Sequence, residues 1–200
     1  MEFLIKYKFE QILNIDEFCY PNVDELFGEI FSVNGNNNEH QTKIGEIHMD
    51  LYYCDTHHDL ITAFDRSGVA FEIGNLIIDF NRNELIKEIE DLIRENENPN
   101  ILVINQLTLF SSFRNKGYGK KILKGIEDVY IGKAGIIILK SFPRQHEIRL
   151  KGSKEYSELK FNSLEQNIER AQKSLNKFYE DCGYKNLPEV DNFYFKEIPL

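Results

Sequence analysis

The sequence predicts a single α/β domain over residues 1–200, and three observations lead to this expectation. The chain has 200 residues, 42% of them hydrophobic and 12% aromatic, which is enough to bury one core. Segments with the period-two alternation of strands and segments with the spacing of amphipathic helices follow one another, without an internal repeat or a long linker. In the second half, two buried strand patterns flank a helix of about a dozen residues, which predicts a βαβ unit with locally parallel strands.

The first part of the chain is expected to hold two strands and a short helix. Residues Phe3 to Phe9 alternate between apolar and other side chains, which is typical of a half-buried strand. From Asp24 to Val33, apolar residues recur three and four positions apart and predict a helix. The run Asn34 to Asn38 has turn composition, and Lys43 to Cys54 alternates again, which predicts the second strand.

Two helices are predicted in the middle of the chain. The spacing of apolar residues favours a helix over Ser67–Phe80, although Gly74 weakens it, and a clearer amphipathic helix over Glu84–Glu95. Pro99 disfavours helical backbone at the residue before it, so the second helix is expected to end there.

The second half of the chain supplies the βαβ unit, a long loop and two further elements. Strands are predicted at Ile101–Phe110 and Gly135–Leu139 because both segments are rich in aliphatic residues, and a helix is predicted between them at Gly117–Val129. A long polar segment, Ser141–Asn162, has the length of a functional lid or a partly mobile loop. The remaining predicted elements are a helix over Ser163–Cys182, closed by Gly183, and a strand over Asn192–Ile198.

Composition argues against several broad classes. The formal charge is −9 and the pI about 5.1, which argues against broad nucleic-acid binding. No run approaches the ~18 apolar residues of a membrane span, and the first six residues do not resemble a signal peptide. Cys19, Cys54 and Cys182 are far apart, so we expect no disulfide framework, no structural zinc site and a reducing cytoplasm. The adjacent pair His57-His58 points to different faces of a regular element, so no metal site is expected.

The segment with the clearest chemistry is Arg114-Asn115-Lys116-Gly117-Tyr118-Gly119, between a buried strand and a helix. Unpaired N–H groups at a helix N-terminus attract anions, and glycine lets a bulky anion approach the backbone. Five cations lie within eleven residues that contain no acid, although cations at a first helical turn oppose the helix dipole. The pattern therefore favours an anion site, and the alternative is a solvated helix that begins with lysines. The five cations are Arg114, Lys116, Lys120, Lys121 and Lys124.

This motif is neither a Walker A loop nor a dinucleotide fingerprint. Its Arg-x-x-Gly-x-Gly pattern after a buried strand resembles the signature of the GCN5-related N-acetyltransferase (GNAT) superfamily. The block Ala171–Tyr184, which contains Phe178-Tyr179 and Gly183-Tyr184, is similar to the late helix of that family. The resemblance covers about residues 101–184. It implies a GNAT-like domain that binds acetyl-CoA as co-substrate. The helices predicted between Ser67 and Glu95 depart from the family and imply a helical insertion before the fourth strand.

The resemblance also implies roles for individual residues. The backbone of Leu107 and Leu109 would hold the pantetheine arm in a slot between the diverging strands that end at Phe110 and start at Gly135. A backbone N–H near Leu109 would polarise the thioester carbonyl. The segment Arg114 to Lys120 would hold the phosphates through its N–H groups. The cofactor-binding residues implied are Leu107, Leu109, Arg114, Asn115, Lys116, Gly117, Tyr118, Gly119 and Lys120, with further charge from Lys121.

Tyr179 is implied as the catalytic residue that gives a proton or hydrogen bond to the departing thiolate. The alternative is a core tyrosine beside Leu175 and Phe178. An amine would attack directly, without an acyl-enzyme, so Cys182 is expected to be structural and Tyr118 to serve in packing. The general base stays open. Candidates for it are Glu46, His48, Asp50, Glu72, His146 and an ordered water, and Phe142–Glu147 is either a substrate lid or a surface loop.

The function expected is therefore acetyl-CoA-dependent N-acetylation of a primary amine. The acidic balance favours a cationic small molecule or a peptide as acceptor, with neither nucleic acid nor membrane as a partner. The alternative is an acyl-CoA-binding module without catalysis, used for sensing or assembly. An RNA-directed acetyltransferase is disfavoured by the net charge.

Overall fold

The computed structural model describes residues 2–9, 23–34, 40–54, 59–65, 68–95, 98–187 and 190–199. Cys19, the pair His57-His58 and residues 35–38 of the expected turn lie outside these ranges.

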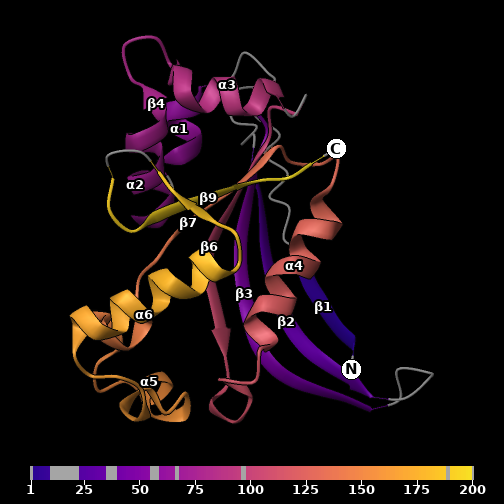
Figure 1. Ribbon diagram of the computed structural model, residues 1–200, viewed down its shortest axis with the longest axis vertical. Coiled ribbons are helices and arrows are strands. Elements are labelled where there is room, and N and C mark those ends of the chain that lie inside the picture. Colours follow the sequence, from indigo (N-terminus) through magenta and orange to yellow (C-terminus); the bar gives the residue numbers. More distant parts are fainter. Residues whose placement is uncertain are drawn as a thin grey trace.

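The centre of the fold is a seven-stranded mixed sheet with the order β1-β2-β3-β6-β7-β9-β8 (Figure 1). Strands β6 and β7 pair in parallel, and the other neighbours in the described sheet pair antiparallel. The strands are β1 (Glu2–Phe9), β2 (Val23–Asn34), β3 (His40–Tyr52), β6 (Ile101–Leu109), β7 (Ile136–Lys140), β8 (Lys185–Asn186) and β9 (Phe193–Glu197).

A helical insertion lies between β3 and β6, as the sequence predicted. Its helices are α1 (Leu60–Phe64), α2 (Gly68–Ile77) and α3 (Lys87–Glu95), and the short strands β4 (Ile78–Asp79) and β5 (Glu84–Leu85) form a hairpin between the last two. The insertion gathers at one end of the molecule (Figure 1).

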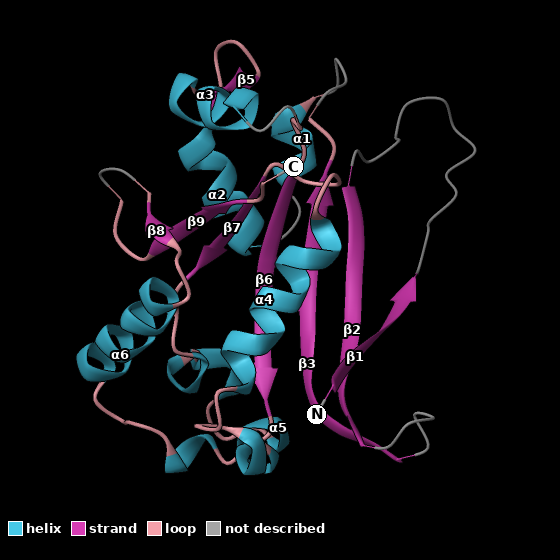
Figure 2. Cartoon of the chain, turned by 45° about the vertical axis from the view of Figure 1, so that its right-hand side comes forward, coloured by secondary structure: helices cyan, strands magenta, loops and turns pink. Residues whose placement is uncertain are grey.

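The remaining helices come after the fourth strand of the large sheet. They are α4 (Tyr118–Tyr130), α5 (Lys154–Glu158) and α6 (Ile168–Asp181). Figure 2 shows α4 running along the sheet beside β6, whereas α6 lies on the side of β7 and β9. Short 3-10 turns occur at η1 (Ser111–Phe113), η2 (Arg144–His146), η3 (Ile148–Leu150) and η4 (Phe161–Ser163).

The sheet separates two apolar cores, because successive side chains of a strand point to opposite faces. In β6, Leu102 and Ile104 face the core that contains Ile122 and Ile126 of α4. Their neighbours Ile101 and Val103 face the core formed with α1, α2 and α3. A buried strand with both faces covered is expected to be apolar throughout, which is why Ile101–Ile104 was recognisable from sequence.

The helix predicted over Asp24–Val33 is wrong, because these residues form β2. Leu26 and Ile30 face the core beneath α4, whereas Phe27 is half exposed on the opposite face. The spacing of apolar residues on two faces of one strand imitated a helical stripe. Pairing with both β1 and β3 decides the outcome, since tertiary context overrides weak local preference.

Other boundaries shift for local reasons. The last helix begins at Ile168 rather than Ser163, because Asn167 caps it by accepting a hydrogen bond from the Arg170 N–H at 3.0 Å. The stretch predicted as the Ser141–Asn162 loop contains η2, η3, α5 and the first part of η4. Helix α1 and strand β8 were not predicted, since each has five residues or fewer.

We expect Gly74→Ala to destabilise the protein, because a Cβ at this position would lie 2.6 Å from the Cβ of Phe64, where α1 and α2 touch. Overpacking of this kind costs about 1–3 kcal/mol. The matched control is Gly125→Ala in α4, where a Cβ meets nothing within 4 Å and should stabilise the helix by about 0.5–1 kcal/mol. Urea unfolding measures the free energy of unfolding of both variants. Equal stability of the Gly74→Ala and wild-type proteins would contradict the close contact of α1 with α2.

Candidate active site

The candidate site begins where β6 and β7 diverge. Their parallel register runs from Ile101 opposite Ile136 to Ile104 opposite Leu139. Strand β6 then continues to Leu109 with β3 as its partner. The side of Asn105–Leu109 that faces away from β3 therefore has no strand partner in the described chain, and Figure 1 shows β7 turning away. The backbone N–H and C=O groups on that side need hydrogen-bond partners other than a strand.

Strand β6 also carries a bulge at this point. Met49 of β3 lies opposite Ile104, whereas His48 lies opposite Gln106, so Asn105 is the extra residue. A bulge bends its strand and redirects the side chain of the extra residue. Here it allows Asn105 to reach the carboxylate of Asp50 on the face opposite α4, where its Nδ2 donates to Oδ2 at 2.7 Å.

A cavity of about 1030 Å³ fills the divergence. Strand β6, the glycine motif, α6 and residues 142–149 contribute to its wall. Of the residues that the sequence analysis assigned to the site, those in the wall are Leu107, Leu109, Arg114, Asn115, Gly117, Tyr118, Gly119 and Tyr179. Lys116 and Lys120 do not line this cavity. Two blocks that are distant in the sequence, the glycine motif and helix α6, therefore line the same cavity.

The glycine motif ends in a tight turn that presents the start of α4 to the cavity. Gly117 is the N-cap and has φ +76°, in the left-handed region that favours glycine, and no side chain caps the helix. A Cβ at Gly117 would meet nothing within 4 Å, so the approach to the helix N-terminus is open. A Cβ at Gly119 would lie 3.1 Å from Cζ of Phe178, so the second glycine serves the packing of α4 against α6.

Arg114 connects the motif to the rest of the wall. Its Nε donates to the Leu109 carbonyl and its Nη2 to the Leu159 carbonyl, each at 2.8 Å, and its guanidinium lies over the Phe161 ring. Burial lowers the pKa of Arg114 below its usual range. Its Nη1 is buried and has no hydrogen-bond partner among the described residues. Arg114 therefore has one donor group left for an anionic ligand.

The lysines of the motif have individual surroundings. The Lys120 ammonium donates to the Asp181 carbonyl at 2.9 Å, at the C-terminus of α6. Lys124 lies 2.9 Å from a carboxylate oxygen of Asp128, and Lys116 lies over the Phe113 ring. A carbonyl, a carboxylate and an aromatic ring of the protein thus balance part of the positive charge of these lysines. The cations at the start of α4 are not all directed at one site.

Tyr179 lies in the cavity wall on α6. Its ring contacts three aromatic neighbours, Phe178, Tyr184 and Tyr194, at centroid distances of 5.2, 5.9 and 6.0 Å. Burial raises the pKa of Tyr179 well above its usual range. The phenol therefore stays protonated at neutral pH and can donate a proton or a hydrogen bond. Cys182 is buried behind it, and burial raises the pKa of this thiol too.

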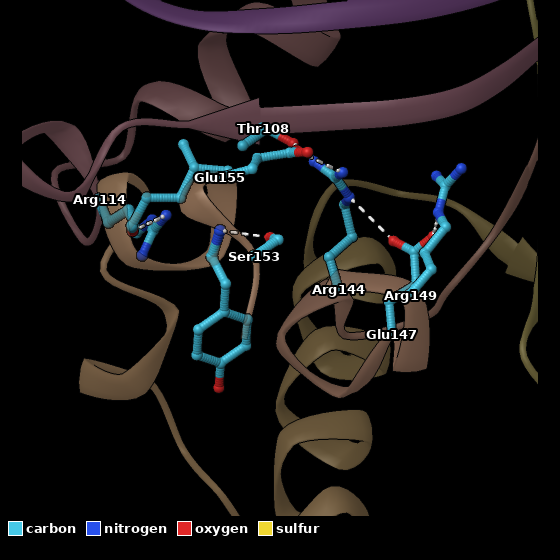
Figure 3. A network of polar contacts seen from close by, with 9 residues as sticks. Thr108, Arg114, Arg144, Glu147, Arg149, Ser153 and Glu155 are labelled. Atoms are coloured by element: carbon cyan, nitrogen blue, oxygen red, sulfur yellow. Dashed lines mark hydrogen bonds and ion pairs between the residues drawn. The ribbon is translucent and has the colours of Figure 1, made fainter. Parts of the chain in front are cut away.

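Residues 141–164, which include the Ser141–Asn162 segment predicted as a lid or a mobile loop, close one side of the cavity. In Figure 3, Arg144 lies at the centre of its polar contacts. One guanidinium nitrogen donates to Thr108 Oγ1 on β6 at 2.6 Å and another to Glu155 at 3.0 Å, while Nε lies 3.6 Å from Glu147. Thr108 and Arg144 were not individually predicted, because nothing in the local sequence marks a contact across 36 positions.

The candidate general bases differ in their partners. Glu46 is exposed and pairs with Lys43 at 2.6 Å, and Glu72 of α2 pairs with Lys140 at the end of β7. Asp50 is buried, with His48 close to it. Among the described residues, no group of three or more His, Cys, Asp or Glu side chains is placed to hold a metal ion. In the same part of the chain, no helix is long and apolar enough to cross a membrane.

No protein-family model matches this chain, and no curated protein matches it. Its structure is similar to several solved structures. A chain of the KacTA–DNA complex aligns with a TM-score of 0.41 and 10% identity, over 87% of this chain and 68% of that one. A chain of AtaTR bound with AcCoA aligns with a TM-score of 0.40 and 11% identity, over 87% of this chain and 70% of that one. Arylalkylamine N-acetyltransferase 2 from Aedes aegypti aligns with a TM-score of 0.39 and 16% identity, over 85% of this chain and 73% of that one.

The likeness concerns the fold alone. The chain has the glycine turn that the resemblance implied, at the start of the helix after the fourth strand of the mixed sheet. It also has the helical insertion that the sequence predicted as a departure from the family.

The prediction that excluded nucleic acid as a partner is wrong. Chains with a similar fold occur in the KacTA–DNA complex and in AtaT complexed with acetyl-methionyl-tRNAfMet, the latter at 9% identity and a TM-score of 0.38. The net charge of −9 sums the whole chain, whereas binding depends on where charges lie. It therefore gives no ground for excluding this class of partner.

We expect the raised pKa of Tyr179 to appear as an alkaline dependence of stability. A phenol whose pKa is higher in the folded state stabilises that state fully below its unfolded value, about 10, and the contribution is lost as the pH rises through the folded value. The free energy of unfolding of the wild type, relative to Tyr179→Phe, should be constant between about pH 7 and 9 and fall above about pH 10. Urea titrations at each pH measure this. A difference that is flat to about pH 12 would contradict the burial of the hydroxyl.

Proposed function

We propose that the protein is an acetyl-CoA-dependent N-acetyltransferase that transfers the acetyl group to an amine by direct attack. The observation that carries this proposal is one cavity, about 1030 Å³ in volume, that joins the open N-terminus of α4, the unpaired side of β6 and the hydroxyl-bearing Tyr179. Pockets that bind drug-sized ligands have volumes of about 300–1,000 Å³, so this cavity, at the upper end of that range, has room for a long co-substrate. We propose that residues 1–200 act as one such domain, in the cytoplasm.

The residues of the wall fit the parts of acetyl-CoA. The free N–H groups after Gly117 and the buried Nη1 of Arg114 are donors suited to phosphate oxygens. The unpaired side of β6 near Leu107 and Leu109 offers main-chain groups to the amides of a pantetheine arm, as an added strand would. The thioester would then lie in the divergence of β6 and β7.

The chemistry expected of Tyr179 is proton donation to the departing thiolate. Its raised pKa keeps the phenol protonated, and its position in the wall gives access to the cavity. Cys182 is unsuited to form an acyl-enzyme, because a buried thiol with a raised pKa is a poor nucleophile. Direct attack by an amine therefore suits the residues present.

We expect Gly117→Glu to abolish the binding of acetyl-CoA. The change adds a negative charge at the helix N-terminus and forces a side chain into left-handed backbone at φ +76°. The matched control is Gly125→Glu on the same helix, where a Cβ meets nothing within 4 Å. Calorimetric titration with acetyl-CoA should show binding to the wild type and the control only. Equal affinity of all three proteins would place the phosphates elsewhere.

We expect Tyr179→Phe to lower kcat by about 10²-fold or more without changing the Kd of acetyl-CoA, since general acid catalysis contributes about 10²–10⁴-fold. Thiol release is measured with a panel containing an alkylamine, an arylalkylamine, a lysine peptide and an aminoacyl-tRNA. A sensor or assembly module would bind acetyl-CoA and acetylate none of them. An unchanged kcat in the variant would remove Tyr179 from the mechanism.

A further inference from the structure

A cluster of polar side chains lies at the bulge of β6, and no step of the function proposed above uses it. It consists of His48 and Asp50 on β3 and Asn105 on β6. Oδ1 of Asp50 lies 3.3 Å from Nε2 of His48, and Oδ2 accepts the hydrogen bond from Asn105 at 2.7 Å. Tyr52 lies beside them, with its hydroxyl 3.4 Å from the same Oδ2. The carboxylate thus connects the imidazole to the bulged residue.

Several polar atoms of the cluster are buried and incompletely satisfied. Asp50 is 2% exposed, in the middle of a sheet whose neighbouring side chains are largely apolar. Oδ1 of Asn105 is buried without a hydrogen-bond partner among the described residues. Nε2 of His48 and Oδ1 of Asp50 make no hydrogen bond there and have only their ion-pair contact with each other at 3.3 Å. An unsatisfied buried polar atom costs about 1–3 kcal/mol, so this incompletely satisfied group calls for a functional explanation.

The cluster adjoins the cavity on the face of the sheet opposite α4. Ile47 and Met49 face the core beneath α4, so the alternating residues His48 and Asp50 face the other way. Asn105 and Gln106 are both in the cavity wall, and Gln106 lies directly opposite His48 in the strand register. Cross-strand neighbours have Cβ atoms about 4.5–5.5 Å apart, so the imidazole lies one side chain from the cavity.

The imidazole is held firmly without being sealed off. It stacks on Phe27 of β2 at a centroid distance of 4.1 Å and an interplanar angle of 14°, and its side chain remains 25% exposed. Two other candidate bases, Glu46 and Glu72, are occupied by lysine partners. His146 has no carboxylate of the described residues within ion-pair distance, whereas His48 has Asp50.

We propose that His48 is the general base that removes the proton from the attacking amine, and that Asp50, held by Asn105, is the positioning residue that stabilises the imidazolium. The proposal rests on the acetyltransferase function proposed above. It assigns the acceptor to the face of the sheet opposite α4, so that the amine approaches the thioester from that face, where β6 and β7 diverge.

The step balances without a further reactant. The amine nitrogen gives its electron pair to the thioester carbonyl carbon, and the carbon–sulfur bond breaks with its electrons on sulfur. The proton lost by nitrogen goes to the His48 imidazole, where the carboxylate 3.3 Å away offsets the new positive charge. Tyr179 supplies the proton that the thiolate takes up.

The test uses His48→Ala in the full chain, with acetyl-CoA and the primary amine of the panel that the wild type acetylates fastest. We expect kcat to fall by about 10²-fold or more and the Kd of acetyl-CoA to stay unchanged. Added free imidazole should restore part of the rate, because the space beside Phe27 accepts a flat ring. A purely structural histidine would not be rescued in this way. Asp50→Asn should lower kcat rather than raise KM, and imidazole should not rescue it.

The matched control is Glu46→Ala, two residues away on the same strand and face, which should retain wild-type kcat. His48→Asn, with a smaller loss of packing, repeats the measurement if thermal unfolding shows that the alanine variant is unfolded. Wild-type kcat in a folded His48 variant would overturn this inference and leave the acetyltransferase intact. Loss of kcat without rescue would also overturn it. A wild type that acetylates no amine of the panel would overturn both proposals.

Discussion

The parting of β6 from β7 after Ile104 is the constraint on which the candidate site depends. In a parallel sheet, neighbouring strands satisfy each other's backbone groups, and a strand that loses its neighbour must find other partners. Strand β6 keeps β3 on one side as far as Leu109, so its shape persists while its other side opens. Because β6 carries apolar core residues before the opening and cavity residues after it, the same strand anchors the fold and forms the wall of the site.

Two arginines hold the opening in shape, and they do so from opposite directions. Arg114 comes after β6 and reaches the Leu159 carbonyl, whereas Arg144 lies in the segment after β7 and reaches back to Thr108. Both guanidinium groups lie over the Phe161 ring, at 5.3 and 5.8 Å. The planar, multiply donating guanidinium suits such bridges, in which a lysine would make a single point contact. The 141–164 segment is consequently tied to the strand that it covers.

The sequence allowed prediction of the elements with strong local signals and of the motif at Arg114–Gly119. The uniformly apolar runs of β6 and β7, the amphipathic stripe of α4 and the helical insertion are all in the structure. Strand β2 was missed because its spacing of apolar residues satisfied a helical template, and only pairing on both edges distinguishes the two. The role of Gly119 in packing against Phe178, and the contact of Lys120 with the end of α6, depend on tertiary approach. No spacing rule contains that information.

The polar cluster at the bulge also depends on tertiary contacts that could not be predicted from the sequence. His48 and Asp50 were visible as candidates, since both are on one face of an alternating strand. Their distinction from Glu46 and Glu72 comes from contacts made far along the chain: Asn105 lies 55 positions from the carboxylate that it holds. Lysines neutralise the exposed acids, whereas the buried acid faces an imidazole. Burial without full compensation is costly for a fold. Asn105, which holds the buried carboxylate, lies in the cavity wall, and this position argues that the site accounts for the cluster.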